Sequence, residues 1–181
     1  MTRVLRIVRQ ARWDSPGDLD WLAGDDIPAP PLLDFANTCN DCLSVWLVGE
    51  GGGDEHRIVT ALAATRDKLD VFDYVLFARE HLDAARTELR AVGGDTADEG
   101  VNRHHRDLAP LSAARVLAIT KKVWHEGQPP TRLSKRQVGQ LIADAVRAGR
   151  IPMEGLSPKL REDIRRRLQN GPSEPPRPTQ G

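Results

Sequence analysis

The sequence contains no long apolar run, and this shortage argues against a membrane-spanning protein. A helix that crosses a bilayer needs about 18 or more consecutive apolar residues, and no such stretch occurs. The opening residues have Arg at every third position from Arg3 to Arg12, and they lack the apolar core and small-residue cleavage site of a secretory signal. We therefore expect a cytoplasmic protein that does not bind a membrane.

Cysteine and aromatic residues are also scarce. Two cysteines cannot supply the disulfide framework of a small secreted domain. Hydrophobic residues make up 39% of the chain, so we expect an ordered core of modest size. Three of the four tryptophans lie early in the chain, which predicts that the N-terminal part has a core of its own; they are Trp13, Trp21 and Trp46. The enrichment in Ala, Arg, Asp and Gly is typical of proteins from GC-rich bacteria.

The charges cancel over the whole chain but are unevenly distributed. Residues 1–60 contain five Arg and ten acidic residues, a net charge of −5, whereas residues 131–170 contain ten basic and four acidic residues, a net charge of +6. Such asymmetry bears on partners and association rather than on the fold. It predicts an acidic front and a basic rear.

Local patterns predict an α+β fold, in which a small N-terminal sheet of two or three strands packs with helices and a basic all-helical lobe follows. Apolar residues predict strands at 2–10 and 42–49. Residues 70–77 suit either a strand or a continuous helix, and their β-branched and aromatic residues favour the strand. Helices are expected at 55–69, 78–92, 110–124, 134–148 and 158–170.

Capping residues support the last two helices. Ser134 and Gln137 match a capping box, and Gly149 suits the position after a helix end. Ser157 is expected to cap the last helix. The prolines of residues 28–31 are expected to exclude a regular element there.

These elements suggest two lobes joined by a linker. We expect an α+β lobe over residues 1–126 with a polar loop at 95–109, and a proline-containing linker at 127–131. A basic helical lobe over 132–170 and a disordered tail over 171–181 complete the prediction.

Four residues could form a metal site: Cys39, Cys42, His104 and His105. The two cysteines have the spacing of half a zinc site, and adjacent histidines can share an ion when they lie in a loop. One cysteine pair without a second pair at defined spacing is a weak signal, however. The alternative is that Cys42 opens a buried strand, the histidines lie in solvent and Asp107 accepts hydrogen bonds at a helix entrance.

Three catalytic or nucleotide motifs are incomplete. Residues 105–108 match the start of a protein-kinase catalytic loop, but Ser112 stands where a metal-binding Asn is required. The glycine-rich segment 49–53 is followed by Asp54 where a dinucleotide-binding motif needs a third glycine, and its acidic neighbours would repel phosphate. A Gly-x-Ser-x-Gly motif does not occur, so nothing in the sequence demands an enzyme.

The basic residues near the C-terminus are the strongest remaining signal. Their positive charge could contact the phosphates of a nucleic acid or an acidic partner surface. The candidate binding residues are Lys135, Arg136, Arg147, Arg161, Arg165 and Arg166. The eight residues between the last two helices are too many for the turn of a helix-turn-helix motif.

We therefore expect a small interaction or accessory protein that binds another protein without catalysis and without a cofactor. The first alternative is a nucleic-acid-binding protein that acts through the basic helices. The second is a zinc protein or metal-dependent hydrolase that uses Cys39, Cys42, His104 and His105.

Overall fold

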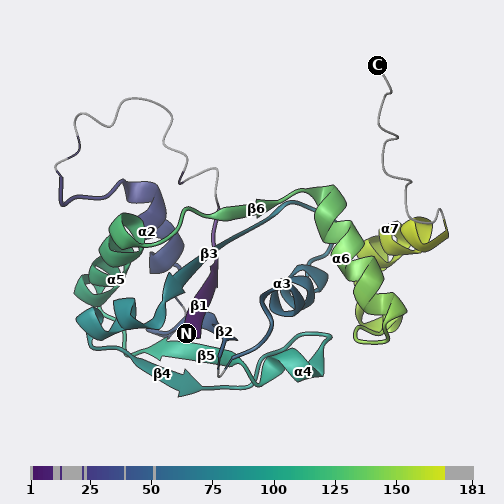
Figure 1. The fold of residues 1–181 in the computed structure, drawn as a ribbon, viewed down its shortest axis with the longest axis horizontal. Coiled ribbons are helices and arrows are strands. Elements are labelled where there is room, and N and C mark those ends of the chain that lie inside the picture. The colour runs from purple at the N-terminus through teal and green to yellow at the C-terminus, as the bar shows by residue number, and fades with distance from the viewer. Residues whose placement is uncertain are drawn as a thin grey trace.

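The computed structural model covers all 181 residues and describes residues 2–9, 13, 22, 24–38, 40–50 and 52–169. These residues form one six-stranded sheet in which all neighbouring strands are antiparallel (Figure 1). The strands are β1 (Thr2–Ile7), β2 (Leu43–Gly49), β3 (Phe72–Ala78), β4 (Glu88–Ala91), β5 (His105–Ala109) and β6 (Thr131–Leu133). Their order across the sheet is β4-β5-β2-β1-β3-β6, so the first strand lies near the centre.

Helices cover both faces of the sheet. The α-helices are α2 (Ala29–Ala36), α3 (Glu55–Ala64), α4 (Glu99–Asn102), α5 (Ala113–Glu126), α6 (Lys135–Arg147) and α7 (Pro158–Gln169). Two short 3-10 helices, Arg79–Ala85 and Met153–Gly155, connect some of these elements. Figure 1 shows α2 and α5 side by side at one end of the molecule and α6 and α7 at the other. No helix in the described ranges is long and apolar enough to cross a membrane.

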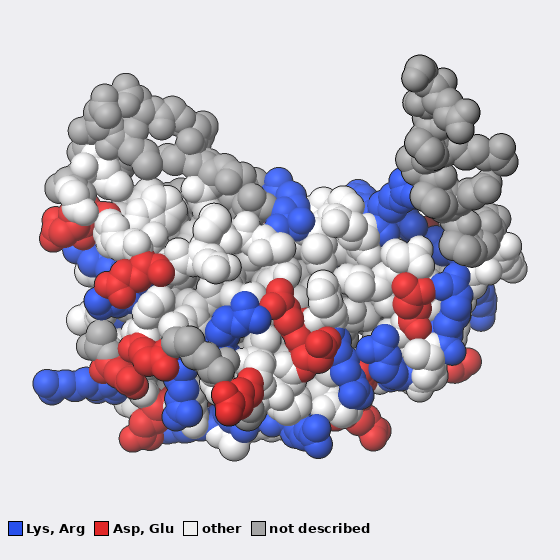
Figure 2. Space-filling model, in the orientation of Figure 1, with Lys and Arg blue, Asp and Glu red and all other residues white. Residues whose placement is uncertain are grey.

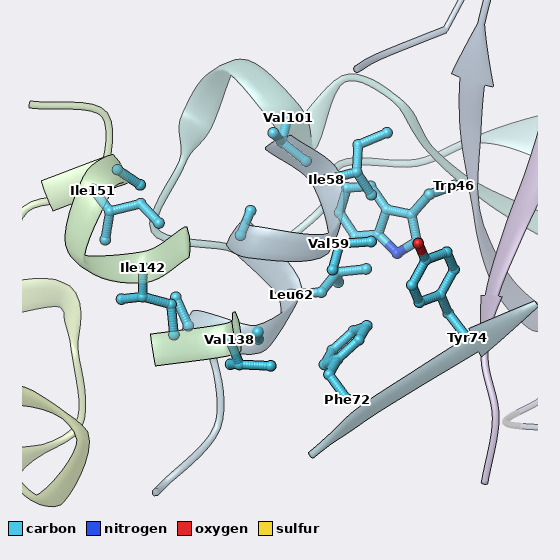
Figure 3. Close-up of a cluster of buried hydrophobic side chains, with 14 of the residues drawn as sticks. Trp46, Ile58, Val59, Leu62, Phe72, Tyr74, Val101, Val138, Ile142 and Ile151 are labelled. Atoms are coloured by element: carbon cyan, nitrogen blue, oxygen red, sulfur yellow. The ribbon is translucent and has the colours of Figure 1, made fainter. Parts of the chain in front are cut away.

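The alternation of apolar residues in β1 divides the core into two clusters. Val4 points to one face, where it belongs to a cluster with Phe35 of α2 and residues of α5. Leu5 points to the other face, where its cluster includes Ile58 of α3 and Ile142 of α6 (Figure 3). Both clusters are fully enclosed at their centres, and the sheet therefore has no face that is wholly open to solvent.

The prediction of a sheet with two or three strands is wrong, because the sheet has six. The predicted helix at 78–92 is replaced by a 3-10 helix and β4, and the predicted loop at 95–109 contains α4 and β5. β4 is a four-residue edge strand with no buried residue, so no apolar pattern marks it. Pairing with β5, rather than local propensity, makes it a strand.

The prediction that prolines exclude a regular element at 28–31 is also wrong. Pro30 and Pro31 lie in the first turn of α2, where the backbone N–H groups have no acceptor within the helix. A missing N–H therefore costs nothing at these positions. The prolines mark the beginning of a helix here.

Other local predictions are confirmed. Residues 72–78 form a strand, β3, in which all but the last residue are buried. Ser134 and Gln137 form the capping box of α6, and Gly149 has a left-handed φ of 67° after this helix. Ser157 Oγ accepts a hydrogen bond from Leu160 N (3.3 Å) at the start of α7.

The residues after the predicted linker join the rest of the chain in two ways. β6 pairs with β3, with Leu133 opposite Phe72. The helix α6 contacts α3, and the two share a core cluster. The boundaries at 127–131 stay a prediction, and the predicted tail at 171–181 lies outside the described residues.

Candidate functional site

The structure describes three of the four predicted metal ligands, and it does not bring Cys42 close to His104 and His105. Cys39 lies outside the described residues, Cys42 immediately precedes β2, and His105 of β5 pairs with Trp46 of β2. Cys42 lies four positions before Trp46 in the chain, which places it about 13 Å from the His105 position along the strand direction. The described part of the chain contains no group of three or more His, Cys, Asp or Glu residues that could hold a metal ion. The geometry therefore gives no support to zinc binding by the four residues together.

His105 belongs to β5 and not to a solvated loop, so that part of the prediction is wrong. Its ring packs against Trp46 with the centroids 4.8 Å apart. Its Nε2 lies 3.8 Å from Asp107 Oδ1, which also accepts a hydrogen bond from Ser44 Oγ (3.3 Å). Asp107 thus joins two side chains within the sheet, and it does not cap a helix as expected. Ser44 bonds to the carboxylate rather than to the imidazole, so the arrangement does not activate a serine nucleophile.

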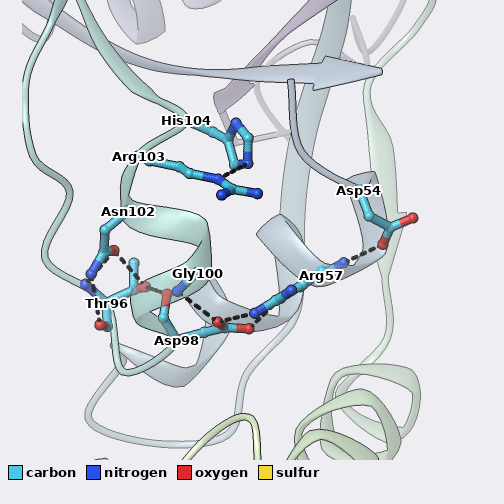
Figure 4. Close-up of polar contacts among 8 residues, drawn as sticks. All are labelled: Asp54, Arg57, Thr96, Asp98, Gly100, Asn102, Arg103 and His104. Atoms are coloured by element: carbon cyan, nitrogen blue, oxygen red, sulfur yellow. Dashed lines mark hydrogen bonds and ion pairs between the residues drawn. The ribbon is translucent and has the colours of Figure 1, made fainter. Parts of the chain in front are cut away.

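Three arginines influence His104, and one of them, Arg103, lies directly beside it (Figure 4). Arg103 Nε donates a hydrogen bond to His104 Nε2 (3.2 Å). The pKa of His104 is lowered, first by burial and then by the charges of Arg103, Arg106 and Arg57. The imidazole is therefore neutral near neutral pH and accepts a proton less readily than a free histidine.

An ion pair between Asp98 and Arg57 holds the segment that precedes His104 in place (Figure 4). Asp98 accepts two hydrogen bonds from Arg57, one from Nε (2.7 Å) and one from Nη2 (2.6 Å). The bonds from Arg57 lower the pKa of Asp98. Thr96 and Asn102 are joined in the same segment by hydrogen bonds between Thr96 Oγ1 and Asn102 Oδ1 (2.8 Å) and between Asn102 Nδ2 and Thr96 O (3.2 Å). This network attaches α4 to α3 and has the character of a structural connection.

The glycine-rich loop between β2 and α3 is closed by its own hydrogen bonds. Gly49 N donates to Gly53 O (3.0 Å), and Gly53 N donates to Leu47 O (3.0 Å). The side chain of Asp54 caps α3 by accepting a bond from Arg57 N (2.8 Å). These N–H groups are already occupied, and a carboxylate occupies the cap, so the loop is not arranged as a phosphate cradle.

A polar pocket of about 380 Å³ lies where α2 ends and β2 begins; it is lined by Arg6, Asn37, Thr38, Asn40, Cys42, Ser44 and Asp107. Arg6 donates hydrogen bonds to the carbonyl groups of Ser44 (2.9 Å), Asn37 (3.2 Å) and Asp34 (3.3 Å). Burial lowers the pKa of Arg6, and the nearby charge of Asp34 opposes this effect. The guanidinium group thus holds the C-terminal end of α2 against the sheet, where positive charge suits the helix dipole.

An apolar groove of about 480 Å³ lies between α2 and α5, on the other side of the same loop. Its apolar lining residues are Leu32, Ala36, Leu111, Ala113, Ala114, Val116 and Leu117. Leu117 is 38% exposed, and Leu33 of α2 is 56% exposed. We name the feature formed by the lining residues the α2–α5 groove; Leu33 follows the lining residue Leu32 in α2. Sequence reasoning missed it because the prolines hid α2, although the Leu32-Leu33 pair was visible.

The predicted basic residues lie at the end of the molecule formed by α6 and α7, where Figure 2 shows Lys and Arg side chains gathered around a few acidic ones. Three of them pair with acids: Lys135 with Asp70, Arg147 with Asp144 and Arg166 with Glu162. Arg161 donates to the carbonyl groups of Glu154 (2.8 Å) and Leu156 (3.0 Å) and is therefore structural. Arg136 and Arg165 are exposed, and no hydrogen bond or ion pair with another described residue engages them.

No protein-family model, curated protein or solved structure matches the chain. The sites above therefore stand on their geometry alone. Among them, the α2–α5 groove combines volume, apolar lining and an exposed leucine.

Proposed function

We propose that this chain is an interaction protein that binds a partner protein through the α2–α5 groove, without bond chemistry. The exposure of Leu117 (38%), which lines an apolar groove, is the observation that carries the proposal. Leu33 (56%) adds an exposed leucine on α2, one of the two helices that form the groove. Isolated exposed leucines are ordinary, but a leucine that lines an apolar concavity belongs to a site that a partner side chain can fill.

The groove can supply a useful share of a binding free energy. Together the two side chains expose about the surface of one whole leucine. Burying a leucine contributes about 2 kcal/mol, and every 1.4 kcal/mol changes a dissociation constant about tenfold. Loss of both leucines is therefore expected to weaken a partner by about tenfold or more.

The test is photo-crosslinking in the cell from position 117, followed by binding measurements on the purified partner. The same crosslinking residue at position 71 is the control, because Val71 is similarly exposed (37%) but is not part of the groove. We expect capture from position 117 only, and about tenfold weaker binding by the Leu33→Ala/Leu117→Ala variant. Capture from neither position, or equal binding by the double variant, would overturn the proposal.

Nucleic-acid binding is a second candidate function, favoured by Arg136 and Arg165. Both are exposed on α6 and α7 and are not engaged by any acidic side chain in the described ranges. Phosphate contacts release counterions, so the affinity should fall steeply with salt. A filter-binding titration compares the wild type with the Arg136→Gln/Arg165→Gln variant. An affinity that is flat across salt concentrations, or unchanged in the variant, would exclude this function.

A further inference from the structure

The strand β4 forms one edge of the sheet, and its outer side has no strand partner among the described residues (Figure 1). The hydrogen bond from Leu47 N to His104 O (3.0 Å) continues the register of β2 and β5, so His104 points its backbone groups at β2. Successive residues of an antiparallel strand point their N–H and C=O groups to opposite sides, so those of Asp107 point at β4, where Arg90 is its partner. The same alternation directs the N–H and C=O groups of Leu89 away from the sheet.

The outer edge of β4 is accessible to another strand. Ala91 is exposed and, two positions after Leu89, also directs its N–H and C=O groups outward. The side chains of Glu88 and Arg90 are 76% and 55% exposed. At the opposite edge of the sheet β6 has only three residues, which follow Pro130 and lead directly into the capping residue of α6. β4 is therefore the edge at which a further strand can extend the sheet.

The charges of β4 favour a second copy of this chain as that strand. In an antiparallel pair related by a two-fold axis through Leu89, Glu88 of each copy lies opposite Arg90 of the other. These positions form non-hydrogen-bonded pairs, in which opposite side chains come closest. Because Arg90 also pairs with Asp107 of β5, acidic and basic residues alternate across the joined sheets in the order Asp107, Arg90, Glu88. Charged residues often protect a strand edge from pairing, but this pattern attracts its own copy.

The contact that the two side chains make within one chain leaves both of them available. Arg90 Nε lies 3.9 Å from Glu88 Oε2, and both side chains remain more than half exposed. A second copy adds an opposite charge to each of them. On the other face of β4, Leu89 packs against the core cluster that contains Val4 and Phe35, so the two copies of Leu89 meet beside this core.

We infer that the chain forms a two-fold symmetric dimer in which the β4 strands of two copies pair antiparallel and join the two sheets into one. The two copies of Leu89 exchange N–H···O=C hydrogen bonds at the centre of the contact. An isologous contact of this kind closes on itself, so association stops at the dimer. The edge is only four residues long, so the dimer is weak and depends on concentration. The inference does not rest on the α2–α5 groove, to which β4 contributes no residue.

The experiment is sedimentation equilibrium of the full chain at low salt, from about 10 μM to about 1 mM. The mean mass should rise with concentration towards twice that of the chain. Glu88→Arg and Arg90→Glu each place like charges opposite one another in both cross-strand pairs, so each variant alone should dimerise about tenfold or more weakly. When the two variants are mixed, every facing pair is again of opposite charge, and the mixture should associate at least as tightly as the wild type.

Two further variants test the backbone contact and provide a control. Ala91→Pro removes an N–H group that points away from β5, so the pairing of β4 with β5 is retained, while the proline blocks an incoming strand. It should weaken the dimer at least as much as the charge reversals. Glu162→Arg makes the same charge reversal on α7, at the exposed pair with Arg166, and should leave self-association unchanged. Circular dichroism verifies that each variant is folded.

Each outcome bears on the inference. A wild-type chain that stays monomeric up to about 1 mM would overturn it and leave the edge to an extended segment of another protein. Self-association that Glu88→Arg and Ala91→Pro leave unchanged would place the contact elsewhere and overturn it as well. Charge variants that fail to associate when mixed would overturn the two-fold register through Leu89. If Arg90→Glu does not fold beside Asp107, Glu88→Arg and Ala91→Pro still decide the question.

Discussion

Replacing Arg57 by Met should destabilise the protein more than replacing its partner Asp98 by Asn. The two side chains differ in their access to water: that of Arg57 is 39% exposed, whereas that of Asp98 is 4% exposed. When Asp98 is replaced by Asn, the guanidinium group can be hydrated, and the new amide oxygen can still cap α4 by accepting the bond that Gly100 N donates to the wild-type carboxylate (3.1 Å). When Arg57 is lost, a buried carboxylate is left without its cation.

The expected costs follow from this asymmetry. Removing one partner of a buried ion pair costs about 3–5 kcal/mol, and the partial exposure of this pair places Arg57→Met near the lower limit, at about 3 kcal/mol. Asp98→Asn should cost about 1.5–2 kcal/mol, the lower part of the range for a lost charged hydrogen bond, because the guanidinium group can be hydrated. Urea denaturation of both variants and the wild type at about pH 7 measures these values.

The pH dependence provides a second readout. In the wild type the bonds from Arg57 lower the pKa of Asp98, so the pair contributes stability above the unfolded pKa and loses it as the pH falls through the folded pKa. In Arg57→Met the unpaired, buried carboxyl has a raised pKa, and protonation relieves its cost. The difference from the wild type should therefore shrink at about pH 4. Equal costs for the two variants, or a difference independent of pH, would refute the reasoning.

Two further predictions concern single contacts. Tyr74, the one tyrosine of the sequence, should titrate at about 12 in an ultraviolet absorbance titration, because burial and the hydrogen bond to Glu55 raise its pKa; Glu55→Gln should lower the midpoint. An unchanged midpoint would show that burial alone sets the pKa. Ser134→Ala should lower the free energy of unfolding by about 1 kcal/mol in urea denaturation, because the capping box of α6 is lost. The control is Ser112→Thr at the start of α5, which keeps a side-chain acceptor at the cap and should change the free energy of unfolding little.

The parts of the fold that the sequence predicts are those with a local cause. Alternating or continuous apolar residues identify β1, β2 and β3, and the caps Ser134 and Ser157 identify α6 and α7. These signals arise within about ten residues of chain and need no knowledge of the partner element.

The missed parts depend on distant partners. β5 contains His105, Arg106 and Asp107, a polar run that becomes a strand through its register with β2. The same register places His105 beside Trp46 and separates it from Cys42, so the spacing of the predicted metal ligands along the chain gave no information about their distance in space. The α2–α5 groove likewise depends on two helices about 80 residues apart in sequence that come into contact only in the folded chain.

The central position of β1 has a consequence for synthesis on the ribosome. β2 and β3 flank β1 in the folded sheet, and the strands that pair with their outer edges follow later in the sequence. The outer edge of β2 has no strand to pair with until β5, which begins at His105, has been synthesised. The outer edge of β3 has none until β6, which begins at Thr131, has been synthesised. We therefore expect a nascent chain that stalls before Thr131 to leave the β3 edge at Phe72–Tyr74 unpaired, since the three residues of β6 pair with this part of the strand.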